Sequence, residues 1–191
     1  MDVEVTTIPV PTSVCGIWRK IERNLDGDVV QDVVLKNLVT NVGKDQLIAN
    51  LLALTASAGV IALGVGASTT TATVSDTRLT YELIGNATRK TLTNTSGAAL
   101  SPSDIVTGDT TIVINATSSA TFTKSITCQA TYNSGDGNND NQFGEYGLFT
   151  SVTNPGTPTS TSGVIFNHLI DPDPTFKNAS NSVTIQISLY F

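Results

Sequence analysis

The chain has 191 residues, of which 39% are hydrophobic and 14% are charged, and its net charge at neutral pH is −6. A domain of this length buries about two-thirds of the surface that its unfolded chain exposes, so a stable core needs neither disulfides nor a metal. The 10 basic residues are scattered, which argues against nucleic-acid binding, and no apolar run reaches the roughly 18 residues of a membrane span.

Residues 1–14 are predicted to form an extended arm. Pro9 and Pro11 interrupt a run of β-branched residues that cannot form a core alone, so we expect the arm to dock on a neighbouring subunit. The first residues include neither a basic nor an apolar leader region. We therefore expect synthesis in a reducing cytoplasm, with Cys15 and Cys128 as free thiols.

Residues 16–40 are predicted to form a β-hairpin. Asp26 and Gly27 are a signal for a two-residue turn, and the returning strand is expected over residues 29–39. Three basic residues of the first strand are interpreted as part of a solvated face: Arg19, Lys20 and Arg23.

One helix is predicted at about residues 43–55, because its apolar residues form a stripe that can cover one face of a sheet: Leu47, Ile48, Leu51 and Leu52. Asn41 is its predicted N-cap. A buried strand is expected at residues 60–63. Gly64 and Gly66 then permit a tight bend where that strand leaves the sheet.

The segment 76–83 is predicted to form one or two helical turns, and strands follow it. Apolar and polar residues alternate over 120–132 and 183–191, which is typical of half-buried strands. Three more strands are expected, at residues 110–117, 145–151 and 163–170. Loops are expected at residues 133–142 and 154–161, and a turn at Asp171–Pro174.

These elements predict an all-β fold, an antiparallel β-sandwich that is jelly-roll-like, with one short helix and the N-terminal arm. Residues 15–191 are expected to form a single domain.

Four short motifs occur in a defined order, and an alternating strand ends the chain: Asn37-Leu-Val-Thr-Asn-Val-Gly, Ala62-Leu-Gly-Val-Gly, Asp76-Thr-Arg-Leu-Thr-Tyr-Glu and Glu145-Tyr-Gly-Leu-Phe. This pattern resembles a family of small structural proteins of tailed bacteriophages, described as tail-fibre, baseplate or minor virion proteins. The resemblance covers about residues 37–92 and 143–191. The chain departs from the family pattern at Val65, where Thr is usual, and in the loop 133–142, which is longer and more acidic. The resemblance implies a virion location and self-assembly rather than catalysis.

No catalytic constellation is evident in the sequence. The only histidine, His168, lies in an apolar strand, where a structural role is favoured. Cys128 is interpreted as a small buried hydrophobe. The glycines at 64–66 lack the Lys that ends a phosphate loop, so no cofactor is expected. Glu82 and Glu145 could meet in space, but nothing in the sequence indicates it.

The loop 133–142 contains the main candidate metal ligands, whereas Asp26–Asp28 and Asp171–Pro174 are interpreted as turns rather than metal sites. Asp136, Asn138 and Asp140 have the opening spacing of a calcium loop, but Asn141 stands at the glycine position and Gly147 at the position of the last ligand. A flexible surface loop is favoured over a cation site.

The sequence therefore predicts a non-enzymatic structural protein of a tailed bacteriophage virion. It would serve as a capsid decoration or head fibre, or as part of the tail fibre or baseplate. Its expected partners are copies of itself and other virion proteins. The alternative is a receptor- or glycan-binding module at a fibre tip, with the loops 133–142 and 154–161 as the tip. Trp18 could stack on a sugar, although core or subunit packing is favoured for it.

Overall fold

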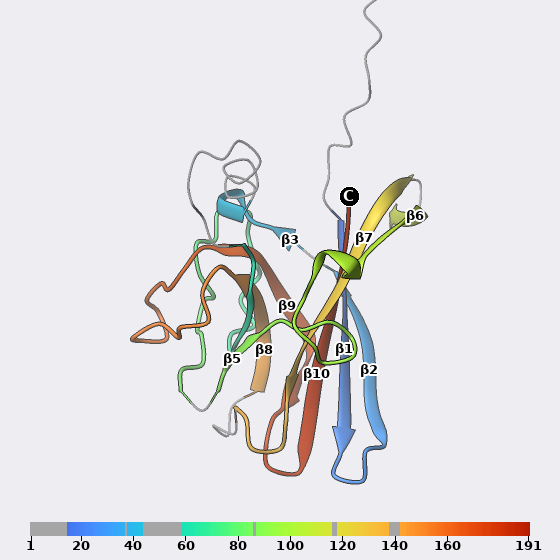
Figure 1. Ribbon diagram of the computed structural model, residues 1–191. Helices are drawn as coiled ribbons and strands as arrows, with labels where there is room; N and C mark the ends of the chain where they lie inside the picture. The colour runs from blue at the N-terminus through green and yellow to red at the C-terminus, as the bar shows by residue number, and fades with distance from the viewer. Residues whose placement is uncertain (1–14, 37, 44–58, 86, 116–117, 138–141) are drawn as a thin grey trace, which may run out of the picture.

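The computed structural model describes residues 15–36, 38–43, 59–85, 87–115, 118–137 and 142–191. The predicted arm 1–14 and nearly all of the predicted helix 43–55 lie outside these residues, as do Asn138 and Asp140. Within them the chain forms two five-stranded antiparallel sheets (Figure 1). The prediction of an all-β antiparallel sandwich is confirmed.

Each sheet combines hairpins from different parts of the chain. Sheet A has the strand order β2-β1-β10-β7-β6, with β1 at Cys15–Asn24, β2 at Val29–Lys36, β6 at Ile105–Asn115, β7 at Ser118–Tyr132 and β10 at Asn181–Tyr190. Sheet B has the order β3-β9-β8-β4-β5, with β3 at Leu38–Val39, β4 at Ala62–Gly66, β5 at Arg89–Thr91, β8 at Gln142–Phe149 and β9 at Ile165–Phe176. A short 3-10 helix, Pro102–Asp104, precedes β6. The chain crosses from one sheet to the other after β2, β5, β7 and β9.

The core lies between the inner faces of the two sheets. The alternation predicted over 120–132 and 183–191 is confirmed by a set of buried side chains: Phe122, Cys128, Ala130, Tyr132, Val183, Ile185 and Ile187. It fails at the last residue, because Phe191 was expected to face the core and is 43% exposed. Trp18 is fully buried, with its ring centroid 6.4 Å from that of Tyr146. Trp18 therefore packs in the core and is not exposed to a sugar.

The hairpin predicted for residues 16–40 is present, but its second strand changes sheets. β2 pairs with β1 in sheet A, whereas β3 pairs with β9 in sheet B. The predicted two-residue turn is also longer, because the strands end at Asn24 and begin again at Val29. Gly27 has a φ of +87°, which places it in the left-handed region that favours glycine.

The predicted N-cap at Asn41 is wrong by one residue. The Thr40 hydroxyl accepts the backbone N–H of Gly43 at 3.1 Å, which is the bond of an N-cap, and Asn41 is already helical. The Asn41 backbone N–H instead donates to the Val74 carbonyl at 2.6 Å.

The helical turns predicted over residues 76–83 are absent, and that segment is irregular. Its backbone bonds to neighbouring chain instead: Ala67 donates to the Tyr81 carbonyl, and Leu83 donates to the Val65 carbonyl, both at 2.9 Å. Leu79 is fully buried against sheet B. Tertiary partners for the backbone groups therefore outweigh the local helical preference.

Two further turn predictions are corrected by the packing of sheet B. Gly64 and Gly66 do not bend the chain out of the sheet, because both are buried within β4. The segment Asp171–Pro174 is not a free turn, because it lies inside β9. It bulges there, since Glu145 of β8 pairs with Ile170 and Phe143 pairs with Thr175.

Candidate functional site

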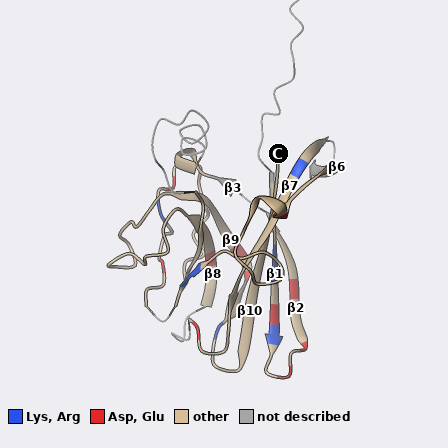
Figure 2. Ribbon diagram, in the orientation of Figure 1, with Lys and Arg blue, Asp and Glu red and all other residues tan. Residues whose placement is uncertain are grey.

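Charged residues are few along the ribbon (Figure 2). Several of them are buried in ion pairs. Three such groups are found within the described residues: Asp76 with His168 and Glu145, Glu82 with Arg89, and Lys20 with Asp171. Buried charges are costly unless they are paired and hydrogen-bonded. These groups are therefore the first place to look for function.

His168 lies at the centre of the first group. It is fully buried in β9, and each ring nitrogen meets a carboxylate. Nδ1 is 2.5 Å from Asp76 Oδ2, and Nε2 is 2.8 Å from Glu145 Oε2. Because both nitrogens face carboxylate acceptors, the arrangement favours the doubly protonated imidazolium.

Glu145 links His168 to the backbone of an adjoining loop. Its carboxylate accepts the Thr80 N–H at 2.9 Å and the Tyr81 N–H at 2.6 Å. At the other end of the same loop, Asp76 accepts both the N–H and the hydroxyl of Thr73. We call residues 73–83 the clamp segment, because these two carboxylates hold it against sheet B through His168.

Glu82 and Arg89 form the second group. The guanidinium binds the Glu82 carboxylate through two nitrogens, with Nη2 2.9 Å from Oε2. Arg89 also lies over the Phe149 ring, 3.7 Å from its centroid, and donates to the Ser151 and Ser162 carbonyls. Burial raises the pKa of Glu82, against the opposing effect of Arg89.

Glu82 and Glu145 do come close to the same backbone, since Gly66 pairs with both. Each carboxylate is nevertheless buried and occupied by its own cation, Arg89 or His168. This geometry gives no support to a pair of catalytic carboxylates, which would need access to substrate.

The glycines of the motifs make room for this network. A Cβ on Gly66 would lie 2.6 Å from both the Tyr81 carbonyl oxygen and Glu145 Cγ. On Gly147 it would lie 2.9 Å from Ile165 Cδ1 and 3.0 Å from Leu79 Cδ2. Residues of the Ala62, Asp76 and Glu145 motifs thus meet in one buried cluster, which sequence reasoning did not foresee.

Lys20 and Asp171 tie the two sheets together. Lys20 of β1 lies 2.6 Å from the Asp171 carboxylate of β9, and both side chains are fully buried. Lys20 also donates to the Asp173 carbonyl, and the Tyr146 hydroxyl donates to Asp171 at 3.2 Å. Burial, followed by the Asp171 charge, raises the pKa of Tyr146.

This arrangement corrects the interpretation of the basic residues of β1 as one solvated face. Arg19 and Arg23 are exposed, but Lys20 points into the core. The alternation of strand side chains could have predicted this position, because Lys20 lies on the same face of β1 as Trp18 and on the opposite face from Arg19.

The candidate cation loop is described only in part. Asp136 pairs with Lys90 at 2.8 Å and accepts the Asn133 N–H at 2.9 Å. Burial alone would raise the pKa of Asp136, but Lys90 and Asn133 outweigh it and lower that pKa. No group of three or more potential metal-binding side chains occurs in the described part of the chain. The cation site at Asp136, Asn138 and Asp140 stays a prediction.

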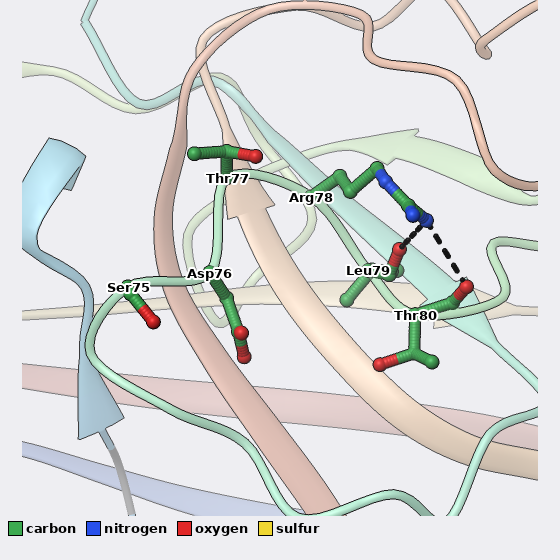
Figure 3. A pocket seen from close by; sticks show the side chains of 6 residues that line it. All are labelled: Ser75, Asp76, Thr77, Arg78, Leu79 and Thr80. Carbon is green, nitrogen blue, oxygen red and sulfur yellow. Dashed lines mark hydrogen bonds between the residues drawn. The ribbon is translucent and has the colours of Figure 1, made fainter.

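A hollow on the surface lies along the clamp segment and is lined by residues 75–80 (Figure 3). Arg78 crosses one side of it and donates to the Leu79 and Thr80 carbonyls, both at 3.2 Å. His168 does not supply a base to this hollow, because its two nitrogens are taken by carboxylates. Cys128 is also no nucleophile, since burial raises the pKa of its thiol to about 12.

The clamp should make the free energy of unfolding depend on pH, and the titration of His168 should follow the same pH range. Burial alone would lower the pKa of His168, but Glu145 and Asp76 outweigh it, so the pKa is raised above its usual 6.5. The imidazolium therefore stabilises the fold fully below pH 6.5, and this contribution is lost as pH rises through the raised pKa.

The pKa of Asp76 is lowered from 3.8, because Thr73 and His168 outweigh burial. Its contribution is present above pH 3.8 and is lost as pH falls through the lowered pKa.

His168 is the only histidine, so its NMR titration can be assigned without ambiguity. We expect a midpoint above 6.5, together with a decline in the free energy of unfolding across the same pH range. His168→Gln should remove that alkaline decline, while the acid limb should remain. A midpoint below 6.5 would contradict the clamp.

Comparisons of the chain with known protein families, curated proteins and solved structures find no match. Among the described residues, no helix is long and apolar enough to cross a membrane.

Proposed function

We propose that the chain is a non-enzymatic structural protein of a tailed bacteriophage virion. It would act as a capsid decoration or head fibre, or as part of the tail fibre or baseplate. The observation that carries the proposal is the position of the motif residues. The motifs that resemble phage structural proteins supply Asp76, Glu82 and Glu145, and all three serve contacts within the chain, those of Glu82 and Glu145 fully buried. A signature of this kind preserves a scaffold and not a catalytic centre.

The surface of sheet A supports the same proposal. β10 contains no charged residue, and Lys124 is the single charged residue of β7. Neighbouring hydroxyls on these strands bond to each other, Thr127 to Ser188 at 2.8 Å and Thr131 to Thr184 at 3.1 Å. A weakly charged face of this kind can be covered by another protein without the cost of desolvating charges.

Exposed apolar side chains also support the proposal. They lie on both edge strands of sheet A, at Val30 and Val34 of β2 and at Ile105 and Val106 of β6. Single exposed apolar residues are ordinary, but residues gathered on a sheet edge are typical of surfaces that other chains cover. The proposed partners are accordingly copies of the same chain and other virion proteins.

The test is to look for the chain in purified virions of the phage whose genome encodes it. We expect purified virions to contain it at a fixed copy number and to show density into which the two-sheet sandwich fits. A chain lacking residues 1–14 should fold, because β1 begins at Cys15, but should be lost from particles if these residues form the docking arm. Absence of the full-length chain from particles, with turnover of a substrate by the purified protein, would overturn the proposal.

A further inference from the structure

The Lys20–Asp171 contact places a primary amine against a carboxylate where water is excluded. Both side chains are 0% exposed, and Lys20 Nζ lies 2.6 Å from Asp171 Oδ2. Apolar residues surround Lys20: Trp18 lies on the same face of β1, and Ile185 is opposite Lys20 on β10, both fully buried. An ion pair in such surroundings carries a large desolvation cost for both charges. A neutral product of the same two groups avoids that cost.

We infer that Lys20 and Asp171 condense in the folded chain to an amide, an isopeptide bond that joins β1 of sheet A to β9 of sheet B. The ion pair is the state from which this bond forms. The two residues are 151 positions apart in the chain, so the bond closes a long loop and restricts the unfolded state. It is a property of the chain itself and does not depend on the proposed function.

The backbone of Asp173 supplies the two hydrogen bonds that a buried amide requires. Asp171 Oδ1 accepts the Asp173 N–H at 2.9 Å, and Lys20 Nζ donates to the Asp173 carbonyl. After condensation the amide oxygen keeps that N–H, and the amide N–H keeps that carbonyl. Both polar groups of the product are thus satisfied by partners that are already in place.

The condensation needs no cofactor and no co-reactant. One proton passes from the ammonium to Asp171 Oδ2 along the 2.6 Å hydrogen bond, which leaves a neutral amine beside a neutral acid. The Nζ lone pair then attacks Cγ of Asp171. The Nζ–Cγ bond forms, the Cγ–Oδ2 bond breaks, and Oδ2 departs as water with two of the three ammonium protons. No group is oxidised or reduced.

Two contacts stabilise the charges that develop during the attack. Negative charge in the tetrahedral intermediate gathers on Asp171 Oδ1, which already faces the Asp173 N–H. The Tyr146 hydroxyl donates at 3.2 Å to Oδ2, the oxygen that leaves. The folded sandwich also holds the amine and the carboxyl group together, so the step needs no bimolecular encounter.

Two other ion pairs of the chain show why Lys20 is the reactive one. Lys90 Nζ lies 2.8 Å from the Asp136 carboxylate, but these side chains are 23% and 18% exposed. Water solvates both charges there, so the ion pair persists. The Arg89–Glu82 pair is buried, but a guanidinium stays protonated and has no free lone pair for the attack. Burial and a primary amine coincide at Lys20.

Mass spectrometry of the denatured full-length chain tests the bond. We expect the purified protein to be lighter than its sequence by the mass of one water molecule. Trypsin should release residues 20–23 attached to residues 125–177, because it does not cleave after an acylated lysine. Lys20→Arg keeps the positive charge but cannot form the amide, so it should have its full sequence mass. Lys90→Arg, the matched control at the exposed pair, should lose water as the parent does.

The rate of the mass change provides a second measurement, on a variant that keeps the reacting pair. Parent chains produced as unfolded aggregates should start at the full sequence mass and lose water after refolding. Tyr146→Phe keeps the ring and removes the hydroxyl, so it should lose water at least about tenfold more slowly. Circular dichroism of each refolded chain confirms that the sheets have formed.

A folded parent that keeps its full sequence mass, with residues 20–23 and 125–177 unlinked in the digest, would overturn the bond. Loss of water by Lys20→Arg would place the condensation elsewhere and would overturn it as well. Either result would leave the presence of the chain in virions untouched, so failure of the bond is distinct from failure of the proposed function.

Discussion

Lys20→Met should lower the free energy of unfolding by about 3–5 kcal/mol, because it leaves a buried carboxylate without its cation. The Lys20 and Asp171 side chains are both fully buried, 2.6 Å apart, and come from opposite sheets. Methionine keeps most of the side-chain volume, so the loss reports mainly the unpaired Asp171 charge. Urea unfolding at pH 7 measures it on newly refolded chains, which carry the free ion pair.

Two comparisons separate charge from packing in that experiment. Arg19→Met removes the neighbouring ion pair on the same strand, but Arg19 and Asp32 are exposed, so we expect little change in stability. The double variant Lys20→Met with Asp171→Asn removes the orphaned charge and leaves an amide oxygen for the Tyr146 hydroxyl. It should regain more than half of the loss. A single variant as stable as the parent would show that the pair contributes nothing.

Glu145→Ala should also destabilise the fold strongly, by about 3–5 kcal/mol, because three donors, of which His168 is fully buried, lose one shared acceptor. These donors are His168 and the backbone N–H groups of Thr80 and Tyr81. The loss should be local as well as global, since these bonds hold the clamp segment on sheet B. Hydrogen exchange should therefore accelerate at Thr80 and Tyr81 more than at Ile185 or Ile187 in the core of sheet A.

Gln142→Ala is the matched control, because Gln142 lies on the same strand, β8, and is exposed. We expect it to leave both stability and exchange unchanged. Equal exchange at Thr80 and Tyr81 in the parent and in Glu145→Ala would show that the clamp segment is held by other contacts.

These expectations share one physical basis: the charges of this chain matter most where they are buried. Removing water strengthens each ion pair and also makes each unpaired partner expensive. The clamp therefore holds an irregular segment on sheet B, and the Lys20–Asp171 pair joins the two sheets, whereas the exposed Arg19–Asp32 pair contributes little to stability.

Much of the sandwich could be predicted because its strands have a period of two. Residues 120–132 and 183–191 show their buried and exposed faces directly in the alternation of apolar and threonine residues. The position of Trp18 in the core agrees with the same pattern. For these elements the local sequence pattern agrees with the packing in the folded protein, so the pattern predicts which side chains are buried.

Local patterns failed where distant residues decide the conformation. The segment 76–83 has a helical spacing of apolar residues, but Glu145, more than 60 residues away, takes its backbone N–H groups. Gly64 and Gly66 are typical of a bend, but within β4 they make room for Phe149 and Glu145. The chain changes sheets between β2 and β3. The sequence cannot predict this change, because side chains alternate with the same two-residue period in strands of either sheet.

The amino-acid sequence by itself determined the all-β class, the inner faces of the long strands and the low charge of the surface. It did so because hydrophobic burial follows the strand period residue by residue. Only the tertiary structure decided that Asp76, His168 and Glu145 form one clamp and that Lys20 faces Asp171 across the core. The reason is that an ion pair between residues far apart in the chain depends on sheet order and register, which no local pattern contains.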